Sequence, residues 1–327
     1  MPVLTLSNAI NTGLRRVLED HPKSIVMGQD VGSLGGVFRV TNGLQKDFGT
    51  DRVIDTPLAE SSIVGTAIGL ALRGYRPVCE IQFDGFVYPA FNQIVSQLAK
   101  IRARSDGRLC LPVVIRIPVG GGIGAVEHHS ESNEAYFTHT AGLRVVCCSN
   151  PLDGHWMLRQ AASGSDPVIF YEPKRRYWDK AEVSESAGTE RVLPLHKARI
   201  VRAGSDLTLL TYGGMVQTCL QAAEAAVEDG RSIEVIDIRS LSPLDLETIT
   251  ASVEKTGRCV VVHEAPVFGG FGAEIGSAVT ERVFYRLLAP VLRVGGFDTP
   301  YPPAKFEDQY LPDLDRVLDA VDRSFAW

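Results

Sequence analysis

The chain has only six cysteines in 327 residues, and no two of them form a Cys-x-x-Cys pair. This spacing argues against a zinc site and against a disulfide framework. Most of the cysteines lie inside apolar runs, so we expect reduced side chains that pack in the core as small apolar groups. The six are Cys79, Cys110, Cys147, Cys148, Cys219 and Cys259.

The chain also lacks a long apolar run and an excess of positive charge. No apolar segment approaches the ~20 residues that span a bilayer, and Met1–Asn8 does not have the basic and apolar parts of a secretory signal. The net charge of −6 and the pI near 5.7 argue against a nucleic-acid partner. We therefore expect a globular, cytoplasmic protein that binds neither membranes nor nucleic acid.

Motifs that bind phosphate or metal are absent as well. The sequence has no Walker loop, no His-Glu-x-x-His motif and no Gly-Asp-Gly motif with a downstream asparagine. Two glycine clusters fail the dinucleotide fingerprint. Glu127 follows Gly122-Ile123-Gly124 where glycine is required, and Gly269–Gly272 is followed by Ile275. The second cluster instead predicts a tight turn into a helix that packs closely on its sheet.

Short apolar strands alternate with helices along the chain, which predicts an α/β fold with room for two domains. Runs such as Val113-Val114-Ile115 are apolar without alternation, as in parallel strands that are covered on both faces. In the first half we expect strands at Ser24–Met27, Pro77–Phe83, Val113–Ile117, Leu143–Cys147 and Val168–Tyr171, and helices at Leu6–Glu19, Ser62–Leu72, Tyr88–Arg104 and Leu152–Ser163.

A charged stretch separates this unit from a second one. Pro173–His196 is rich in charge, without an apolar period, and is typical of an interdomain connection. Beyond it we expect strands at Leu207–Tyr212, Ile233–Ile238 and Cys259–His263, and helices at Met215–Glu228, Leu244–Glu254, Gly272–Phe284 and Leu314–Phe325.

Glu60 is a lone carboxylate in an apolar stretch. It precedes Ile63–Leu72, a predicted helix that is apolar on nearly every face and should be buried, with Gly65 and Gly69 allowing close approach of another backbone. A carboxyl group at the mouth of such a helix would lie in a low dielectric, which favours its protonated, hydrogen-bond-donating form. The alternative is that Glu60 only stabilises the helix dipole from the first turn.

A glycine-rich turn follows the predicted strand Val113–Ile117. The carboxyl end of a strand is where α/β sheets place ligands, and Gly120–Gly124 would form a tight, mobile loop that carries His128 and His129 at its far end. Histidine titrates near neutral pH and therefore suits proton transfer. The alternative is a surface pair of histidines beside Glu127.

A third segment, Glu80–Phe91, ends a strand in a turn. Phe86 and Phe91 flank the entry to the next helix, where an aromatic ring could face a flat heterocycle, although packing in the core is its usual role. Gln82 is polar inside a predicted buried strand, so its amide requires a hydrogen-bond partner.

Together these segments resemble the β subunit of the thiamine-diphosphate-dependent decarboxylating component of 2-oxo acid dehydrogenase complexes. The resemblance covers essentially the whole chain. Its strongest parts are Asp55–Glu60, Glu80–Phe91, His129-Ser130 with Glu134-Ala135, and His263-Glu264-Ala265-Pro266 leading to Gly269-Gly270-Phe271. The segment from Glu80 through Val95 is most similar to the branched-chain 2-oxo acid enzymes, while pyruvate and acetoin enzymes share much of the pattern.

The resemblance implies an α/β fold of two domains and a shared cofactor site. It places a transketolase-like pyrimidine-binding domain at 1–180, a linker at 181–197 and a transketolase C-terminal domain at 198–327. It also implies an α2β2 heterotetramer with thiamine diphosphate between an α and a β subunit. The α subunit would then hold magnesium and the diphosphate, which agrees with the missing Gly-Asp-Gly motif.

Site residues follow from the same resemblance. Glu60 would hydrogen-bond the aminopyrimidine ring, and Leu58 and Gln82 would line its pocket. Phe86 would pack on the pyrimidine; several relatives have tyrosine there, so any hydroxyl contact is lost. His129, rather than His128, would face the thiazolium side and assist acyl transfer to lipoamide.

Some relatives hold a structural potassium ion through backbone oxygens. The matching residues here are Leu111, Val113, Val114, Ala161, Gly164 and Asp166, and Gly164 stands where some relatives have aspartate.

The expected function is oxidative decarboxylation of a branched-chain 2-oxo acid and reductive acylation of the lipoyl group of an acyltransferase core. A pyruvate or acetoin dehydrogenase β subunit is the alternative substrate assignment. An alternative from a different functional class is a non-catalytic structural or docking subunit. A self-contained thiamine enzyme would require a diphosphate site that the sequence lacks.

Overall fold

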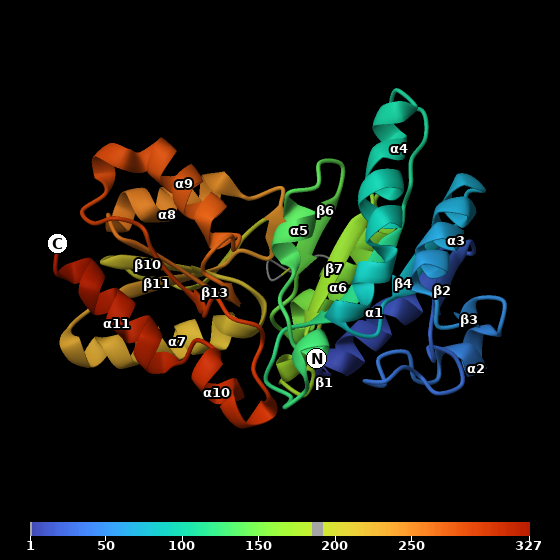
Figure 1. The fold of residues 1–327 in the computed structure, drawn as a ribbon, viewed down its shortest axis with the longest axis horizontal. Helices are drawn as coiled ribbons and strands as arrows, with labels where there is room; N and C mark the ends of the chain where they lie inside the picture. Colours follow the sequence, from blue (N-terminus) through green and yellow to red (C-terminus); the bar gives the residue numbers. More distant parts are fainter. Residues whose placement is uncertain (1, 185–191) are drawn as a thin grey trace.

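The protein consists of two α/β lobes that lie side by side (Figure 1). The computed structural model describes residues 2–184 and 192–327. Residues 185–191, part of the linker predicted at 181–197, lie outside the described residues. Strands and helices alternate in both lobes, which confirms the predicted α/β class.

The first lobe is built on a seven-stranded sheet with the order β12-β6-β7-β5-β4-β2-β3. All neighbouring strands are parallel except β12, which is antiparallel to β6. Helices cover both faces of the sheet, so its strands are buried apolar runs. The strands are β2 (Ser24–Gly28), β3 (Val53–Asp55), β4 (Arg76–Glu80), β5 (Val114–Val119), β6 (Arg144–Cys147), β7 (Val168–Pro173) and β12 (Ser240–Ser242).

Helices α1 (Leu6–Asp20) and α6 (Pro151–Ser163) pack together on one face of this sheet. Asn150 caps α6 by accepting a hydrogen bond from the Asp153 amide at 3.0 Å. The other face is covered by α3 (Glu60–Leu72) and by a segment that ends in α4 (Ala99–Arg104).

The segment before α4 differs from the single helix expected at Tyr88–Arg104. It begins as a 3-10 helix, η1 (Asp84–Ala90), and passes through a π-helical stretch, η2 (Gln93–Leu98). Pro89 lies inside η1 and has no amide to donate, which disfavours a regular α-helix there. The sequence pattern identified the apolar period but not this change of helix type.

The second lobe has a five-stranded sheet with the order β14-β13-β10-β11-β9, parallel except at β9. Helices α7 and α11 lie on one side of it and α8 and α9 on the other (Figure 1). The strands are β9 (Arg199–Arg202), β10 (Leu207–Thr211), β11 (Ile233–Asp237), β13 (Cys259–Pro266) and β14 (Leu292–Gly296). The helices are α7 (Val216–Ala225), α8 (Leu246–Thr256), α9 (Gly272–Val283) and α11 (Leu314–Phe325).

Shorter elements complete the fold. Strands β1 (Val3–Thr5) and β8 (Lys180–Glu182) form a small antiparallel pair. The short α-helices include α2 (Leu44–Phe48), α5 (Glu134–Thr138) and α10 (Glu307–Tyr310). Among the described residues, no helix is both long enough and apolar enough to cross a membrane.

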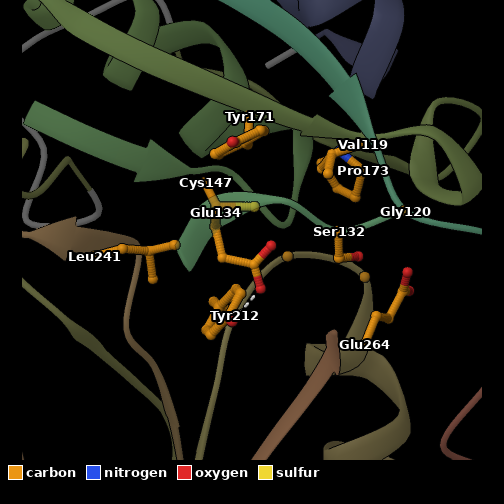
Figure 2. Close-up of a pocket in the computed structure, with 12 residues that line it drawn as sticks. Val119, Gly120, Ser132, Glu134, Cys147, Tyr171, Pro173, Tyr212, Leu241 and Glu264 are labelled. Carbon is orange, nitrogen blue, oxygen red and sulfur yellow. Dashed lines mark hydrogen bonds between the residues drawn. The ribbon is translucent and has the colours of Figure 1, made fainter. Parts of the chain in front are cut away.

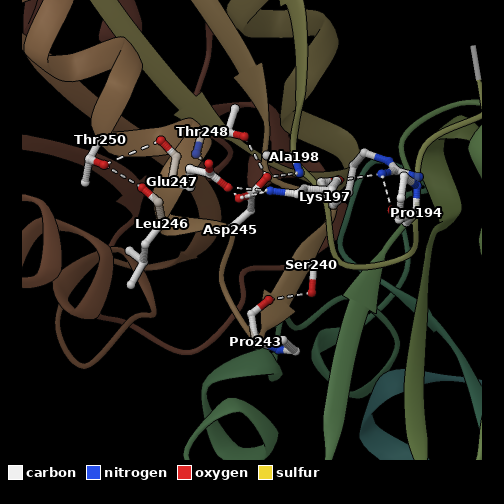
Figure 3. A network of polar contacts seen from close by, with 11 residues as sticks. Pro194, Lys197, Ala198, Ser240, Pro243, Asp245, Leu246, Glu247, Thr248 and Thr250 are labelled. Atoms are coloured by element: carbon white, nitrogen blue, oxygen red, sulfur yellow. Dashed lines mark hydrogen bonds and ion pairs between the residues drawn. The ribbon is translucent and has the colours of Figure 1, made fainter. Parts of the chain in front are cut away.

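The two lobes are joined by more than one connection. After β11 the chain returns to the first sheet, where β12 pairs with β6 (Ser240 opposite Val146). The start of the second lobe is fixed by Asp245, whose carboxylate accepts hydrogen bonds from the Ala198 amide at 3.0 Å and from Lys197 Nζ at 3.1 Å (Figure 3). The pairing of β12 with β6 is a backbone connection that helps to set the orientation of the lobes.

Two further expectations from the sequence were wrong in detail. Lys174, inside the charged stretch expected to connect the domains, is completely buried. Cys110 is exposed, whereas the other five cysteines are free thiols in the core as expected.

Candidate active site

Most of the predicted site residues come together at one edge of the first sheet. Strands β3, β4 and β5 are parallel, so their carboxyl ends open on the same side. The segment after β3 carries Leu58 and Glu60, the segment after β4 carries Gln82 and Phe86, and the segment after β5 carries His129. This edge is where open α/β sheets bind ligands.

Glu60 is the first residue of α3, and its side chain is partly exposed. Helix α3 buries only the face with Ile63, Val64 and Ala67; the opposite face, which includes Thr66 and Gly69, is open. The expected burial on nearly every face is therefore wrong for the single chain, and the Glu60 side chain is partly exposed there. A Cβ added at Gly69 would meet no atom within 4 Å, so no backbone of this chain approaches it closely.

Gln82 and Leu58 differ in their surroundings. Gln82 is buried and donates hydrogen bonds from Nε2 to Asp30 Oδ2 at 3.1 Å and to the Gln29 carbonyl at 3.4 Å. This confirms the expectation that its amide has a partner. Leu58 is 66% exposed, so its side chain is available to a group outside the chain.

An aromatic cluster surrounds His129. The Phe83 ring stacks on the imidazole with centroids 4.0 Å apart and an interplanar angle of 17°. Phe86 meets the same imidazole edge to face, with a centroid distance of 5.0 Å. His128 is the more exposed of the two histidines, and its ring centroid lies 4.3 Å from that of His129. Phe83, which the sequence analysis did not single out, thus belongs to the cluster.

The hydrogen bond of His129 defines its tautomer. Its Nδ1 lies 2.8 Å from the His128 carbonyl oxygen. Because a carbonyl only accepts, Nδ1 carries a proton, and in the neutral ring the lone pair is on Nε2. Nε2 is therefore the atom of His129 that can accept or deliver a proton.

The glycine turn before His129 is held by the second lobe. The Gly121 amide donates to Glu264 Oε2 at 3.0 Å, and the amides of Gly122 and Gly124 donate to the two carboxylate oxygens of Glu307, each at 2.9 Å. The sequence predicted a mobile loop, and the structure shows these amides fixed instead. It also gives a physical reason against a phosphate-binding role, since those donors are already taken.

A buried ion pair anchors the turn that carries Phe86. Lys174 Nζ lies 2.5 Å from Asp84 Oδ1, and neither side chain is exposed. Burial lowers the pKa of Lys174 and raises the pKa of Asp84, because each charged form loses hydration. Asn133 adds a bond from Nδ2 to the Asp84 carbonyl at 3.0 Å, which ties the Phe86 turn to the segment after His129.

A second buried charge cluster lies deeper in the sheet. Arg116 binds Glu172 through Nε and Nη2 at 2.6 and 2.8 Å, and Glu80 through Nη1 at 2.7 Å. Burial alone lowers the pKa of Arg116, but the two carboxylates outweigh it and raise the pKa. Sequence reasoning missed this cluster, although Glu80 and Arg116 lie inside apolar strands and a charge there requires a partner.

A small cavity lies between the lobes beside the glycine turn (Figure 2). Glu134 and Tyr212 point toward one another there, and the Tyr212 hydroxyl donates to Glu134 Oε1 at 2.5 Å. Burial raises the pKa of Glu134, because its charged form is desolvated. The predicted motif after His129 thus contributes a carboxyl group to the contact between lobes.

Most of the predicted potassium residues already have hydrogen-bond or ion-pair partners within the chain. The Val113 oxygen accepts the Val168 amide at 2.9 Å, and the Ala161 oxygen accepts the Gly164 amide at 3.2 Å. The Gly164 oxygen accepts Arg76 Nη1 at 2.8 Å, so a guanidinium already supplies the positive charge. Leu111 and Val114 are buried, and the Asp166 carboxylate pairs with arginines. The potassium site stays a prediction from the resemblance, and the Arg76 guanidinium argues against it.

Family models match both lobes. Residues 3–179 match the transketolase pyrimidine binding domain, and residues 196–317 match the transketolase C-terminal domain. A solved chain described as "Split gene transketolase, inactive beta4 tetramer" superposes with a TM-score of 0.78 over 99% of this chain and 98% of that chain. At 22% identity this likeness shows the fold alone. The chain is thus a transketolase-like α/β protein.

Curated relatives define the family within that class. The chain is 59% identical over 324 residues to "Pyruvate dehydrogenase E1 component subunit beta" of Leifsonia xyli, which covers 99% of this chain and 95% of the relative. It is 53% identical over 321 residues to "3-methyl-2-oxobutanoate dehydrogenase subunit beta" of Mycobacterium tuberculosis, with coverages of 98% and 91%. The chain belongs to the β subunits of 2-oxo acid dehydrogenases, which are parts of an oxidoreductase complex.

Proposed function

We propose that the chain is the catalytic β subunit of a branched-chain 2-oxo acid dehydrogenase and works with an α subunit in an α2β2 tetramer. Its reaction is oxidative decarboxylation of the acid and transfer of the acyl group to the lipoyl group of an acyltransferase core. The observation that supports this is the gathering of Glu60, Phe86 and His129 at one carboxyl edge of the sheet.

The residues present fit one half of a thiamine diphosphate site. Phe86 offers an apolar ring face to a flat heterocycle, and Glu60 offers a carboxyl group to a ring nitrogen. The amides of Gly122 and Gly124 are taken by Glu307, so the diphosphate and its magnesium belong on the α subunit. Thiamine diphosphate, once bound, supplies the nucleophilic carbon and the electron sink for decarboxylation.

Glu60 has the role of holding a proton against the heterocycle. In the single chain its side chain is partly exposed, beside the open face of α3. Docking of the α subunit over this face would exclude water and favour the protonated carboxyl group. The environment that the sequence suggested for Glu60 would then arise only in the assembled enzyme.

His129 has the role of proton donor in acyl transfer. When the lipoyl disulfide opens, one sulfur takes the acyl group and the other takes a proton. His129 Nε2 is the ring nitrogen that the His128 carbonyl leaves available, so it can take up a proton from solvent and then give it to the leaving sulfur. Phe83 and Phe86 hold the ring in a fixed orientation. His128 lacks the Phe83 stack.

The branched-chain assignment is supported by the Glu80–Val95 segment and by the 53% identity to a 3-methyl-2-oxobutanoate enzyme. Pyruvate is the second candidate, favoured by the 59% identity to a pyruvate enzyme. The test is a panel of 2-oxo acids assayed on the enzyme reconstituted with its α subunit. We expect the highest kcat/KM with 3-methyl-2-oxobutanoate; a clear preference for pyruvate would overturn the substrate assignment while leaving the family unchanged.

A non-catalytic docking subunit is the alternative from another class. Two measurements distinguish a catalytic subunit from a docking subunit. They are thiamine diphosphate binding with and without the α subunit, and turnover of the parent and of Glu60→Gln. We expect binding only in the tetramer and a loss of turnover in the variant. Tight binding by the isolated β chain, or full turnover by the variant, would contradict the shared catalytic site.

A further inference from the structure

The turn that carries His129 is closed at its base and fastened at its tip. At the base, the Gly120 amide donates to the Glu131 carbonyl at 3.1 Å, so the ends of a twelve-residue loop meet. At the tip, the two oxygens of Glu307 each accept one amide, from Gly122 and from Gly124. His129 lies in the loop between the tip and the base. It belongs to the first lobe, whereas Glu307 belongs to the second lobe.

The turn is shaped to receive this carboxylate. Gly122 and Gly124 have φ angles of +87° and +68°, in the left-handed region that favours glycine, and both amides point to Glu307. Such a concave set of amides binds anions, and here the anion is Glu307, which is only 7% exposed. Charge-assisted bonds of this kind are stronger than neutral ones.

Tyr301 orients the carboxylate. Its hydroxyl donates to Glu307 Oε1 at 2.7 Å, and its ring packs against Tyr310 with centroids 4.9 Å apart. A Cβ added at Gly121 would lie 1.8 Å from the Tyr301 hydroxyl oxygen, so only glycine fits at that position. The second lobe thus presents Tyr301 and Glu307 together to the turn.

We propose that Glu307 is a positioning residue that, with Tyr301, fastens the glycine turn and thereby sets His129 for acyl transfer. The inference about His129 rests on the proposed function. The fastening of the turn does not depend on the proposed function, because it consists of the hydrogen bonds that the Gly122 and Gly124 amides donate to Glu307. Loss of one charge-assisted bond should increase opening of the turn about tenfold to a hundredfold.

The first measurement is hydrogen–deuterium exchange of the peptide containing Gly122 and Gly124 in the assembled tetramer, without substrate. Glu307→Gln keeps the shape of the side chain but has one acceptor oxygen fewer, and Tyr301→Phe removes only the orienting hydroxyl. The control is Glu281→Gln, a carboxylate of the same lobe with a side chain that is 81% exposed. We expect about tenfold faster exchange in Glu307→Gln, a smaller increase in Tyr301→Phe and none in the control. Unchanged exchange in both variants would overturn the fastening.

The second measurement separates the two half-reactions of the same proteins. Decarboxylation is followed with ferricyanide as oxidant, and acyl transfer is followed with a free lipoyl domain. We expect Glu307→Gln to keep most of its ferricyanide activity and to lose about tenfold in kcat for acylation of the lipoyl domain. Faster exchange with unchanged acylation would overturn the positioning role. Failure of the parent tetramer in both assays would instead contradict the proposed function, and the exchange data would still test the fastening.

Discussion

The ring of His129 lies nearly parallel to the ring of Phe83, with their centroids 4.0 Å apart. The two residues lie in the segments that follow the neighbouring strands β5 and β4. Phe83 also contacts Phe86 edge to face at 5.9 Å, so one aromatic surface connects the expected cofactor-facing ring to the histidine. Orientation of the imidazole thus depends on a residue that is not expected to touch the substrate.

Phe83→Leu should remove this orientation while preserving apolar volume. An aromatic pair contributes roughly 0.5–1.5 kcal/mol beyond buried area, so acylation of a lipoyl domain should fall about threefold to tenfold. Decarboxylation measured with ferricyanide should change less. The matched control is Phe91→Leu, which lies on the same segment but pairs with Tyr136 and Phe137. Equal losses in the two variants would contradict a specific role of the Phe83 stack.

Lys174→Met should strongly destabilise the chain. Removing the ammonium leaves Asp84 buried without its partner, and breaking a buried pair typically costs about 3–5 kcal/mol in the free energy of unfolding. The control is Lys180→Met, because Lys180 is exposed on β8 and should change stability little. Urea denaturation monitored by circular dichroism measures both. A loss below about 1 kcal/mol for Lys174→Met would show that the pair does not support the Phe86 turn.

The buried His263 should make the free energy of unfolding depend on pH. Burial lowers the pKa of His263 from 6.5 to about 4, since the charged ring would be desolvated. Between pH 6.5 and 4 the unfolded chain therefore binds a proton that the folded chain does not, and stability falls as the pH falls through this window. The contribution lost is about 3 kcal/mol.

The measurement is the difference in free energy of unfolding between the parent and His263→Asn at several pH values. Comparison with the variant isolates His263 from other groups, such as Asp237, whose pKa is raised to about 7 by burial. We expect the parent to lose stability relative to the variant from pH 6.5 to 4 and a constant difference above pH 7. Parallel curves throughout would refute the assignment.

Because Arg76 already binds the carbonyl groups near Gly164, we expect that the chain needs no potassium ion there. Arg76 Nη1 bonds the Ala162 and Gly164 carbonyls, both at 2.8 Å, at the end of α6. The melting temperature should therefore be the same in potassium and sodium chloride at equal ionic strength. Arg76→Met should lose about 1–3 kcal/mol, whereas Arg73→Met, at an exposed neighbouring position, should lose little. A potassium-specific rise in the melting temperature of the parent would contradict this.

Much of the fold was predictable because its strands and helices have clear local patterns. The helix predicted at Leu314–Phe325 has those bounds in the structure, and the turn at Gly269–Gly272 enters α9 as expected. A Cβ at Gly272 would lie 2.5 Å from His263 Nε2, which explains the close packing of that helix on its sheet. Patterns in one segment carry this information, since it concerns residues that are near in sequence.

Contacts between distant segments were not predictable in the same way. Ser240 pairs with Val146 across 94 positions, and the Gly122 amide bonds Glu307 across 185 positions; no local period encodes such contacts. The surroundings of Glu60 were misjudged for a related reason. An apolar helix face signals burial, but the sequence does not say whether the same chain or another one covers it.

The central claim is that Glu60 holds a proton for the cofactor ring, and Glu60→Gln in the reconstituted α2β2 enzyme tests it most directly. The control is Ser61→Ala, the next and exposed residue of α3. We predict an intact tetramer in both variants by sedimentation, and ferricyanide-coupled decarboxylation that falls by about a hundredfold to ten-thousandfold in Glu60→Gln alone. Decarboxylation at the parent rate in Glu60→Gln would contradict the account.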